Sequence, residues 1–159
     1  MGGKEILYKD MKASGPLFLY FIRDGDSVCQ EETDYISKIA GAYGATRATW
    51  YGILNAREDR ARSFQAEHNP AFRLVRDEYL KAVHAFGVLS APTIIQVSSR
   101  GSIVHIWHGY SAASLNEINK AFATVNRKPV QALDFSRAPA VTMYGVGYQQ
   151  STKNGKFGG

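Results

Sequence analysis

The sequence has 159 residues, of which 45% are hydrophobic and 21% are charged, which is typical of one ordinary globular domain. It contains no N-terminal segment of signal-peptide type and no apolar run near the roughly 18 residues that span a bilayer, so we expect a cytoplasmic protein without a transmembrane segment. The net charge is +5, and residues 127–159 carry most of it, with five basic residues against one acidic residue.

The chain has a single cysteine, Cys29. This count excludes an intramolecular disulfide and a cysteine-based zinc site. Four histidines are scattered along the chain, and no glycine-rich phosphate loop is present. We therefore expect neither a metal nor another cofactor.

The first third of the chain is predicted to form a βαβ unit. Residues 16–22 are a continuous apolar run, which is typical of a strand buried on both faces. Asp26 or Ser27 is suited to cap a helix that runs to about residue 43, with an apolar stripe of Val28, Tyr35, Ile36, Ile39 and Ala40. Residues 45–54 are rich in β-branched and aromatic side chains, so they are predicted to return as a parallel strand.

The middle and last thirds continue the alternation of elements. The pattern predicts a helix over 56–68, a short strand over 72–75 and a helix over 77–86. Residues 92–97 and 102–107 are predicted to pair as an antiparallel hairpin, and 111–125 to form the last helix. The expected fold is α/β, with a mixed central sheet covered by helices on both faces.

Two segments carry a resemblance to a known superfamily. Residues 87–104, in which Pro92-Thr93 opens a strand, resemble the signature of thioredoxin-like proteins. Residues 62–75 are similar to the insertion of the TlpA-like and alkyl hydroperoxide reductase/thiol-specific antioxidant (redoxin) branch. The resemblance implies a thioredoxin-like three-layer sandwich with a cis proline at Pro92. It divides the chain into an N-terminal segment 1–13, a thioredoxin-like domain 14–126 and a basic, irregular C-terminal tail 127–159.

The active-site tetrad of that superfamily is degenerate in this chain. Relatives place Cys-x-x-Cys where the first buried strand meets the next helix, and the matching residues here are Asp26-Ser27-Val28-Cys29. Asp26 stands at the position of the attacking cysteine, while Cys29 stands at the resolving position. Ordinary dithiol-disulfide exchange needs both sulfurs, so the resemblance implies that this chemistry is lost.

The peroxiredoxin pattern of the same branch is also incomplete. Cys29 matches its peroxide-attacking cysteine, but Ile22, Asp26 and Pro92 stand where the pattern has Pro, Thr and Arg. A carboxylate beside the thiol raises its pKa, whereas the missing arginine would lower it. Cys29 is therefore interpreted as a buried remnant, with a reactive or redox-sensing thiol and an intermolecular link as alternatives. Asp26, Ser27, Pro92 and Thr93 are expected to shape the site.

The tail combines positive charge with aromatic side chains. A purely solvating tail seldom carries so many apolar residues, so we expect it to bind a protein partner and not nucleic acid. Docking on its own domain is the alternative, and a membrane surface is a third. The expected contact residues are Arg127, Lys128, Phe135, Arg137, Tyr144, Tyr148, Lys153 and Lys156. Because the last helix ends near residue 125, the domain is predicted to fold without residues 130–159.

Two functions are consistent with these observations. The first is a non-catalytic thioredoxin-fold interaction protein, an accessory subunit of a larger complex anchored by its tail. The alternative is a single-cysteine thiol-dependent oxidoreductase or peroxidase of the redoxin branch that uses Cys29 and an external thiol.

Overall fold

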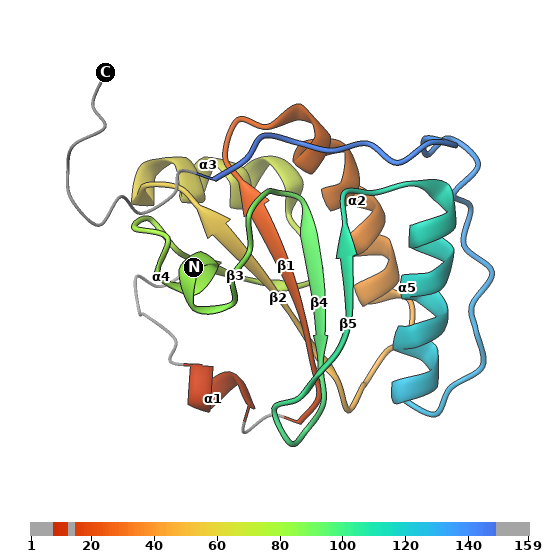
Figure 1. Ribbon diagram of the computed structural model, residues 1–159. Helices are drawn as coiled ribbons and strands as arrows, with labels where there is room; N and C mark the ends of the chain where they lie inside the picture. The colour runs from red at the N-terminus through yellow and green to blue at the C-terminus, as the bar shows by residue number, and fades with distance from the viewer. Residues whose placement is uncertain (1–7, 13–14, 149–159) are drawn as a thin grey trace.

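The computed structural model describes residues 8–12 and 15–148, and within them one five-stranded sheet has the order β3-β2-β1-β4-β5 (Figure 1). The strands are β1 (Leu17–Arg23), β2 (Thr49–Asn55), β3 (Arg73–Arg76), β4 (Thr93–Val97) and β5 (Ile103–His108). β1, β2 and β3 are parallel, whereas β4 is antiparallel to β1 and β5 is antiparallel to β4. The predicted mixed sheet and hairpin are confirmed.

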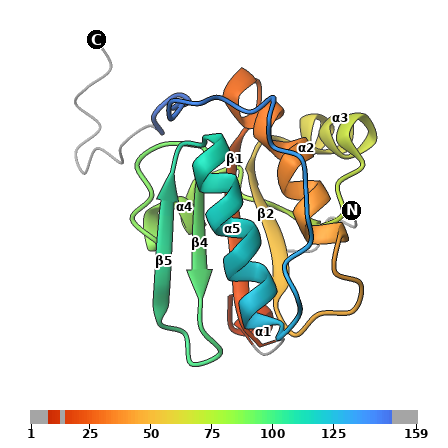
Figure 2. The same ribbon diagram turned by 90° about the vertical axis from the view of Figure 1, so that its right-hand side faces the viewer.

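Helices cover both faces of this sheet. The helices are α1 (Tyr8–Lys12), α2 (Ser27–Gly41), α3 (Glu58–His68), α4 (Lys81–Ala85) and α5 (Ala112–Val125). α2 and α5 lie side by side over one face, and α4 lies on the other (Figure 2). This is the thioredoxin-like three-layer arrangement that the sequence predicted. No helix among the described residues is long and apolar enough to cross a membrane.

The strand β1 is central because its whole apolar run can be buried. Residues 17–22 have no exposed surface, since β2 and β4 flank the strand and helices cover its two faces. α4 is shorter than the predicted 77–86. Leu80 has a left-handed backbone (φ 61°), and both carboxylate oxygens of Asp77 accept hydrogen bonds from Ala82 and Val83 N–H groups, so the helix begins only at Lys81.

The described part of the C-terminal tail lies against the domain. After α5 the chain returns alongside that helix and then crosses the edge where β1 ends and α2 begins (Figures 1 and 2). Phe135 and Tyr148 are only 4% and 8% exposed, so these two side chains are not free to bind a partner in this conformation. The expectation of an extended arm is therefore corrected to the alternative, docking on the chain's own domain. Folding without residues 130–159 stays a prediction. Lys153 and Lys156 lie outside the described residues.

Candidate functional site

Asp26 is the N-cap of α2. It has an extended backbone, and its Oδ1 accepts hydrogen bonds from the N–H groups of Val28 (2.9 Å) and Cys29 (3.1 Å). A carboxylate at the positive end of a helix satisfies amides that have no partner within the helix. Asp26 is also buried, whereas Ser27, the first residue of α2, is exposed. The position of the attacking cysteine is thus filled by a capping group.

Cys29 lies in the first turn of α2 and has no exposed surface. Burial raises the pKa of its thiol far above the ordinary value, and the negative charges of Asp26 and Glu32 raise it further. A backbone hydrogen bond from Arg23 acts in the opposite direction and lowers this pKa. The sequence predicted that the carboxylate of Asp26 raises this pKa, and the direction agrees, but burial is a larger cause than Asp26.

Glu32 is the feature that sequence reasoning missed. Its side chain has no exposed surface, and neither carboxyl oxygen has a hydrogen-bond partner within the described part of the chain. Burial raises the pKa of Glu32 well above its usual range, and its charge raises the pKa of Tyr20 as well as that of Cys29. The signal was helical spacing: Glu32 lies three residues after Cys29 and four before Ile36, on the apolar face of α2.

The loop before β4 faces the start of α2. The Ala91–Pro92 peptide bond is cis, as the resemblance implied. Thr93 is buried, and its hydroxyl donates to the carbonyl of Ser90 at 2.7 Å, which fixes the turn that precedes the strand. Gly145 lies between this loop and Asp26. A Cβ atom built on Gly145 would clash with the Ala91 carbonyl and would also fall 2.5 Å from Asp26 Oδ2, so Asp26 and the loop are close together.

The three basic residues in the described part of the tail differ in their surroundings. Lys128 Nζ donates to the backbone carbonyls of Tyr43 and Ala45, so it fixes the tail to the domain. Arg127 is exposed and has a left-handed backbone (φ 54°) directly after α5. Arg137 is exposed, and Tyr144 is 64% exposed. Among the expected contact residues that the structure describes, the exposed ones are Arg127, Arg137 and Tyr144.

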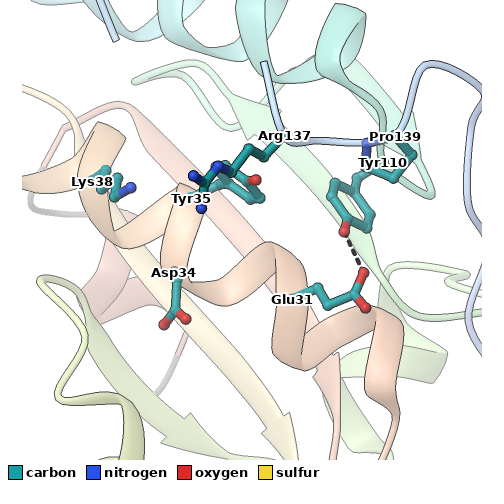
Figure 3. Close-up of a pocket in the computed structure, with 7 residues that line it drawn as sticks. All are labelled: Glu31, Asp34, Tyr35, Lys38, Tyr110, Arg137 and Pro139. Carbon is teal, nitrogen blue, oxygen red and sulfur yellow. Dashed lines mark hydrogen bonds between the residues drawn. The ribbon is translucent and has the colours of Figure 1, made fainter. Parts of the chain in front are cut away.

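A polar cavity of about 510 Å³ lies between α2 and the tail (Figure 3). Its lining combines acidic, basic and aromatic side chains: Glu31, Asp34, Tyr35, Lys38, Tyr110, Arg137 and Pro139. The hydroxyl of Tyr110 donates to Glu31 Oε2 at 2.7 Å, and burial together with this interaction raises the pKa of Tyr110. The charges of the lining are of both signs, and among the described residues no cluster of three or more potential ligands is placed to hold a metal.

A protein-family model decides which family this site belongs to. The model of the AhpC/TSA family matches residues 1–106, a range that holds the whole tetrad, Glu32 and the cis-proline loop. The chain belongs to the AhpC/TSA family. This family lies in the redoxin branch that residues 62–75 and 87–104 indicated. Among curated proteins, no sequence matches the chain.

Solved structures of low sequence identity share the fold. A secreted Mycobacterium tuberculosis disulfide oxidoreductase homologous to E. coli DsbE is 23% identical, with a TM-score of 0.59 over 70% of this chain and 82% of its own. The thioredoxin domain of a Bacteroides vulgatus thiol-disulfide oxidoreductase is also 23% identical (TM-score 0.62, 74% and 85% covered). An uncharacterized conserved protein of Geobacillus kaustophilus is 14% identical and matches 92% of this chain and 84% of its own, with a TM-score of 0.70. These likenesses show a thioredoxin-like fold.

Proposed function

We propose that the protein is a single-cysteine thiol-dependent oxidoreductase of the redoxin branch, with Cys29 as its working sulfur and an external thiol as its resolver. The observation that carries this proposal is the buried carboxyl of Glu32 beside Cys29. Burying a carboxyl group without a hydrogen-bond partner costs about 1–3 kcal/mol, so a purely structural role does not account for it. Buried acids with perturbed pKa values are typical of sites that move protons.

The chemistry needs two exchange steps. The Cys29 thiolate attacks one sulfur of a substrate disulfide and forms a mixed disulfide, while the other sulfur leaves as a thiolate and takes up a proton. An external thiol then attacks the mixed disulfide and restores Cys29. In its ionised form Glu32 would accept the proton of the Cys29 thiol and later return it, since it lies one helical turn after Cys29 and burial makes its carboxylate a stronger base. Family membership and the names of the structural neighbours support the same class of reaction.

The test measures reduction of 2-hydroxyethyl disulfide with glutathione as the external thiol. The wild-type rate is expected to exceed that of a free thiol, and Cys29→Ser is expected to abolish the excess. Glu32→Gln should lower the rate and change its pH profile. Its matched control, Glu31→Gln, alters an exposed neighbour on the same helix and should do neither. A wild-type rate no greater than that of Cys29→Ser would reject the proposal.

The second candidate is a non-catalytic interaction protein. It is favoured by Asp26, which occupies the attacking position as a helix cap, and by the complete burial of Cys29. An anchoring role for the tail has less support, because Phe135 and Tyr148 pack on the domain itself. If the disulfide assay shows no excess rate, this candidate becomes the better account.

A further inference from the structure

The last described residues of the tail pair with the loop around the cis proline. Residues 143–148, which we call the strap, cross the start of α2 at the edge of the sheet (Figure 1). The backbone N–H of Ala91 donates to the Val146 carbonyl (3.3 Å), and the N–H of Tyr148 donates to the Leu89 carbonyl (2.9 Å). Met143 and Tyr110 exchange two backbone hydrogen bonds of 2.8 and 2.9 Å. The strap therefore forms backbone hydrogen bonds with the loop in the way that a short added strand would.

The strap also closes on the degenerate tetrad. Oδ1 of Asp26 caps α2, and its Oδ2 accepts a hydrogen bond from the Val146 N–H at 2.7 Å. The side chain of Arg23 donates to the Gly147 carbonyl. Gly145 permits this approach, because a Cβ there would clash with both the Ala91 carbonyl and the Asp26 carboxylate. The same carboxylate thus holds both the helix and the strap.

Few side chains hold the strap in place. Met143, Tyr144 and Val146 are 44%, 64% and 57% exposed, and only Tyr148 is buried. Burial raises the pKa of the Tyr148 phenol. The charge of Cys29 interacts with this phenol and raises the pKa of Tyr148 further. The Tyr148 hydroxyl has no hydrogen-bond partner among the described residues. Segments held by exposed backbone hydrogen bonds with little apolar burial open at low free energy.

We propose that the strap is a releasable internal ligand that covers the Cys29 site, and that an extended segment of another polypeptide takes its place. Release frees the Leu89 carbonyl and the Ala91 N–H, which are the backbone groups that strand addition uses. It also frees Asp26 Oδ2, which can accept a backbone N–H group of the incoming segment as it does that of Val146. The close approach at Gly145 selects a segment with a glycine facing Asp26. The opening does not depend on thiol chemistry; only its consequence for Cys29 rests on the proposed function.

A matched pair of glycine variants tests the release. Gly145→Ala places a methyl group against Ala91 and Asp26, whereas the methyl group of Gly147→Ala meets the Leu89 carbonyl at an ordinary 3.6 Å. Native-state hydrogen exchange of the full chain is expected to show the Val146 and Tyr148 amides opening at least about tenfold more often than the β1 amides. Gly145→Ala should raise that opening by a further factor of about ten, and Gly147→Ala should leave it within about twofold.

A synthetic peptide tests the replacement. The peptide Met-Tyr-Gly-Val-Gly-Tyr, which has the strap sequence, is expected to slow exchange of the Ala91 amide in the Gly145→Ala protein, and Met-Tyr-Ala-Val-Gly-Tyr should not. If Gly145→Ala does not fold, Tyr148→Ala removes the buried side chain without adding an atom and takes its place in both experiments. Protection of Ala91 by neither peptide would overturn the replacement half of the proposal.

The release itself is overturned by one result. If the Val146 and Tyr148 amides exchange with the same free energy and the same denaturant dependence as the β1 amides, the strap opens only when the whole domain unfolds. That outcome would leave the disulfide assay of Cys29 unaffected. Conversely, an inactive protein whose strap opens locally would reject the proposed function and retain the strap.

Discussion

The two halves of the C-terminal extension are held to the domain in different ways. In residues 127–139, Phe135 is buried beside the ring of Tyr35 (centroids 6.0 Å apart), and Lys128 reaches two backbone carbonyls. In the strap, residues 143–148, backbone hydrogen bonds and the side chains of Arg23 and Asp26 make the contacts, and Tyr148 is the only buried side chain. Val141, between the halves, is 77% exposed. Buried side chains resist separation, whereas backbone pairs at the surface exchange readily with water. The first half is therefore part of the folded core, and the second is suited to reversible attachment.

The largest expected difference between the two halves is in the unfolding free energy of two truncated chains. A chain that ends at Thr142 loses the strap and residues 149–159, and we expect it to lose about 1–2 kcal/mol of unfolding free energy. A chain that ends at Arg127 also loses Phe135 and Ala138, which are 4% and 9% exposed. It should lose at least about 4 kcal/mol, a large share of the stability of a small domain. Urea unfolding measures both, and equal losses would break the distinction.

A single substitution in the first half should have the next largest effect. Phe135→Ala leaves a cavity beside Tyr35, and we expect a loss of about 3 kcal/mol because truncating a buried phenylalanine costs about that much. Val141→Ala is the control, since an exposed side chain contributes within about 0.5 kcal/mol. Thermal unfolding measures the two changes. A Phe135→Ala protein as stable as the control would mean that the first half is held no more firmly than the strap.

The pH dependence of stability reports on the buried carboxyl of Glu32. Because burial raises the folded-state pKa of Glu32 above its ordinary value of 4.5, the folded state keeps a proton that the unfolded state releases. The stabilisation is complete below the unfolded pKa and is lost as pH rises toward the folded pKa, with a slope of up to about 1.4 kcal/mol per pH unit.

Glu32→Leu should remove this slope and stabilise the protein by about 2 kcal/mol at pH 8, because it replaces an unpartnered polar group. The chain that ends at Thr142 should keep the wild-type slope, since Glu32 belongs to the core and not to the strap. Urea unfolding at pH 5, 6.5 and 8 measures all three proteins. If the pH dependence of the unfolding free energy disappeared in the chain that ends at Thr142, its cause would lie in the second half of the extension and not at Glu32.

The smallest expected effect lies within the strap. Asp26→Asn keeps an oxygen that can cap α2 but can turn an N–H group toward the Val146 amide in place of Oδ2. We expect global stability to fall by about 1 kcal/mol and the Val146 amide to exchange about tenfold faster. Residues near Phe135 should exchange at the wild-type rate. Equal acceleration in both halves would show that they open together.

The tetrad and the cis-proline loop could be predicted from sequence, but the closed site could not. Asp26 as a cap, the single sulfur at Cys29 and the Pro92-Thr93 signature are local features, and each lies where the pattern placed it. Glu32 was missed because an acidic residue in the first two turns of a helix normally faces solvent. Its burial depends on what packs over α2.

The amino-acid sequence by itself determined the order of the elements, the sheet type, the helix cap and the family. The continuous apolar run of β1 and the spacing of apolar residues in α2 and α5 are buried when helices are layered on a central sheet. Tertiary structure alone decided where residues 127–148 lie, because an irregular segment has no periodicity that indicates its partner surface. The docking of Phe135 beside Tyr35 and of Val146 on Asp26 joins residues 100 and 120 positions apart. Such contacts depend on shape and on free hydrogen-bonding groups that exist only after the sheet and helices have assembled.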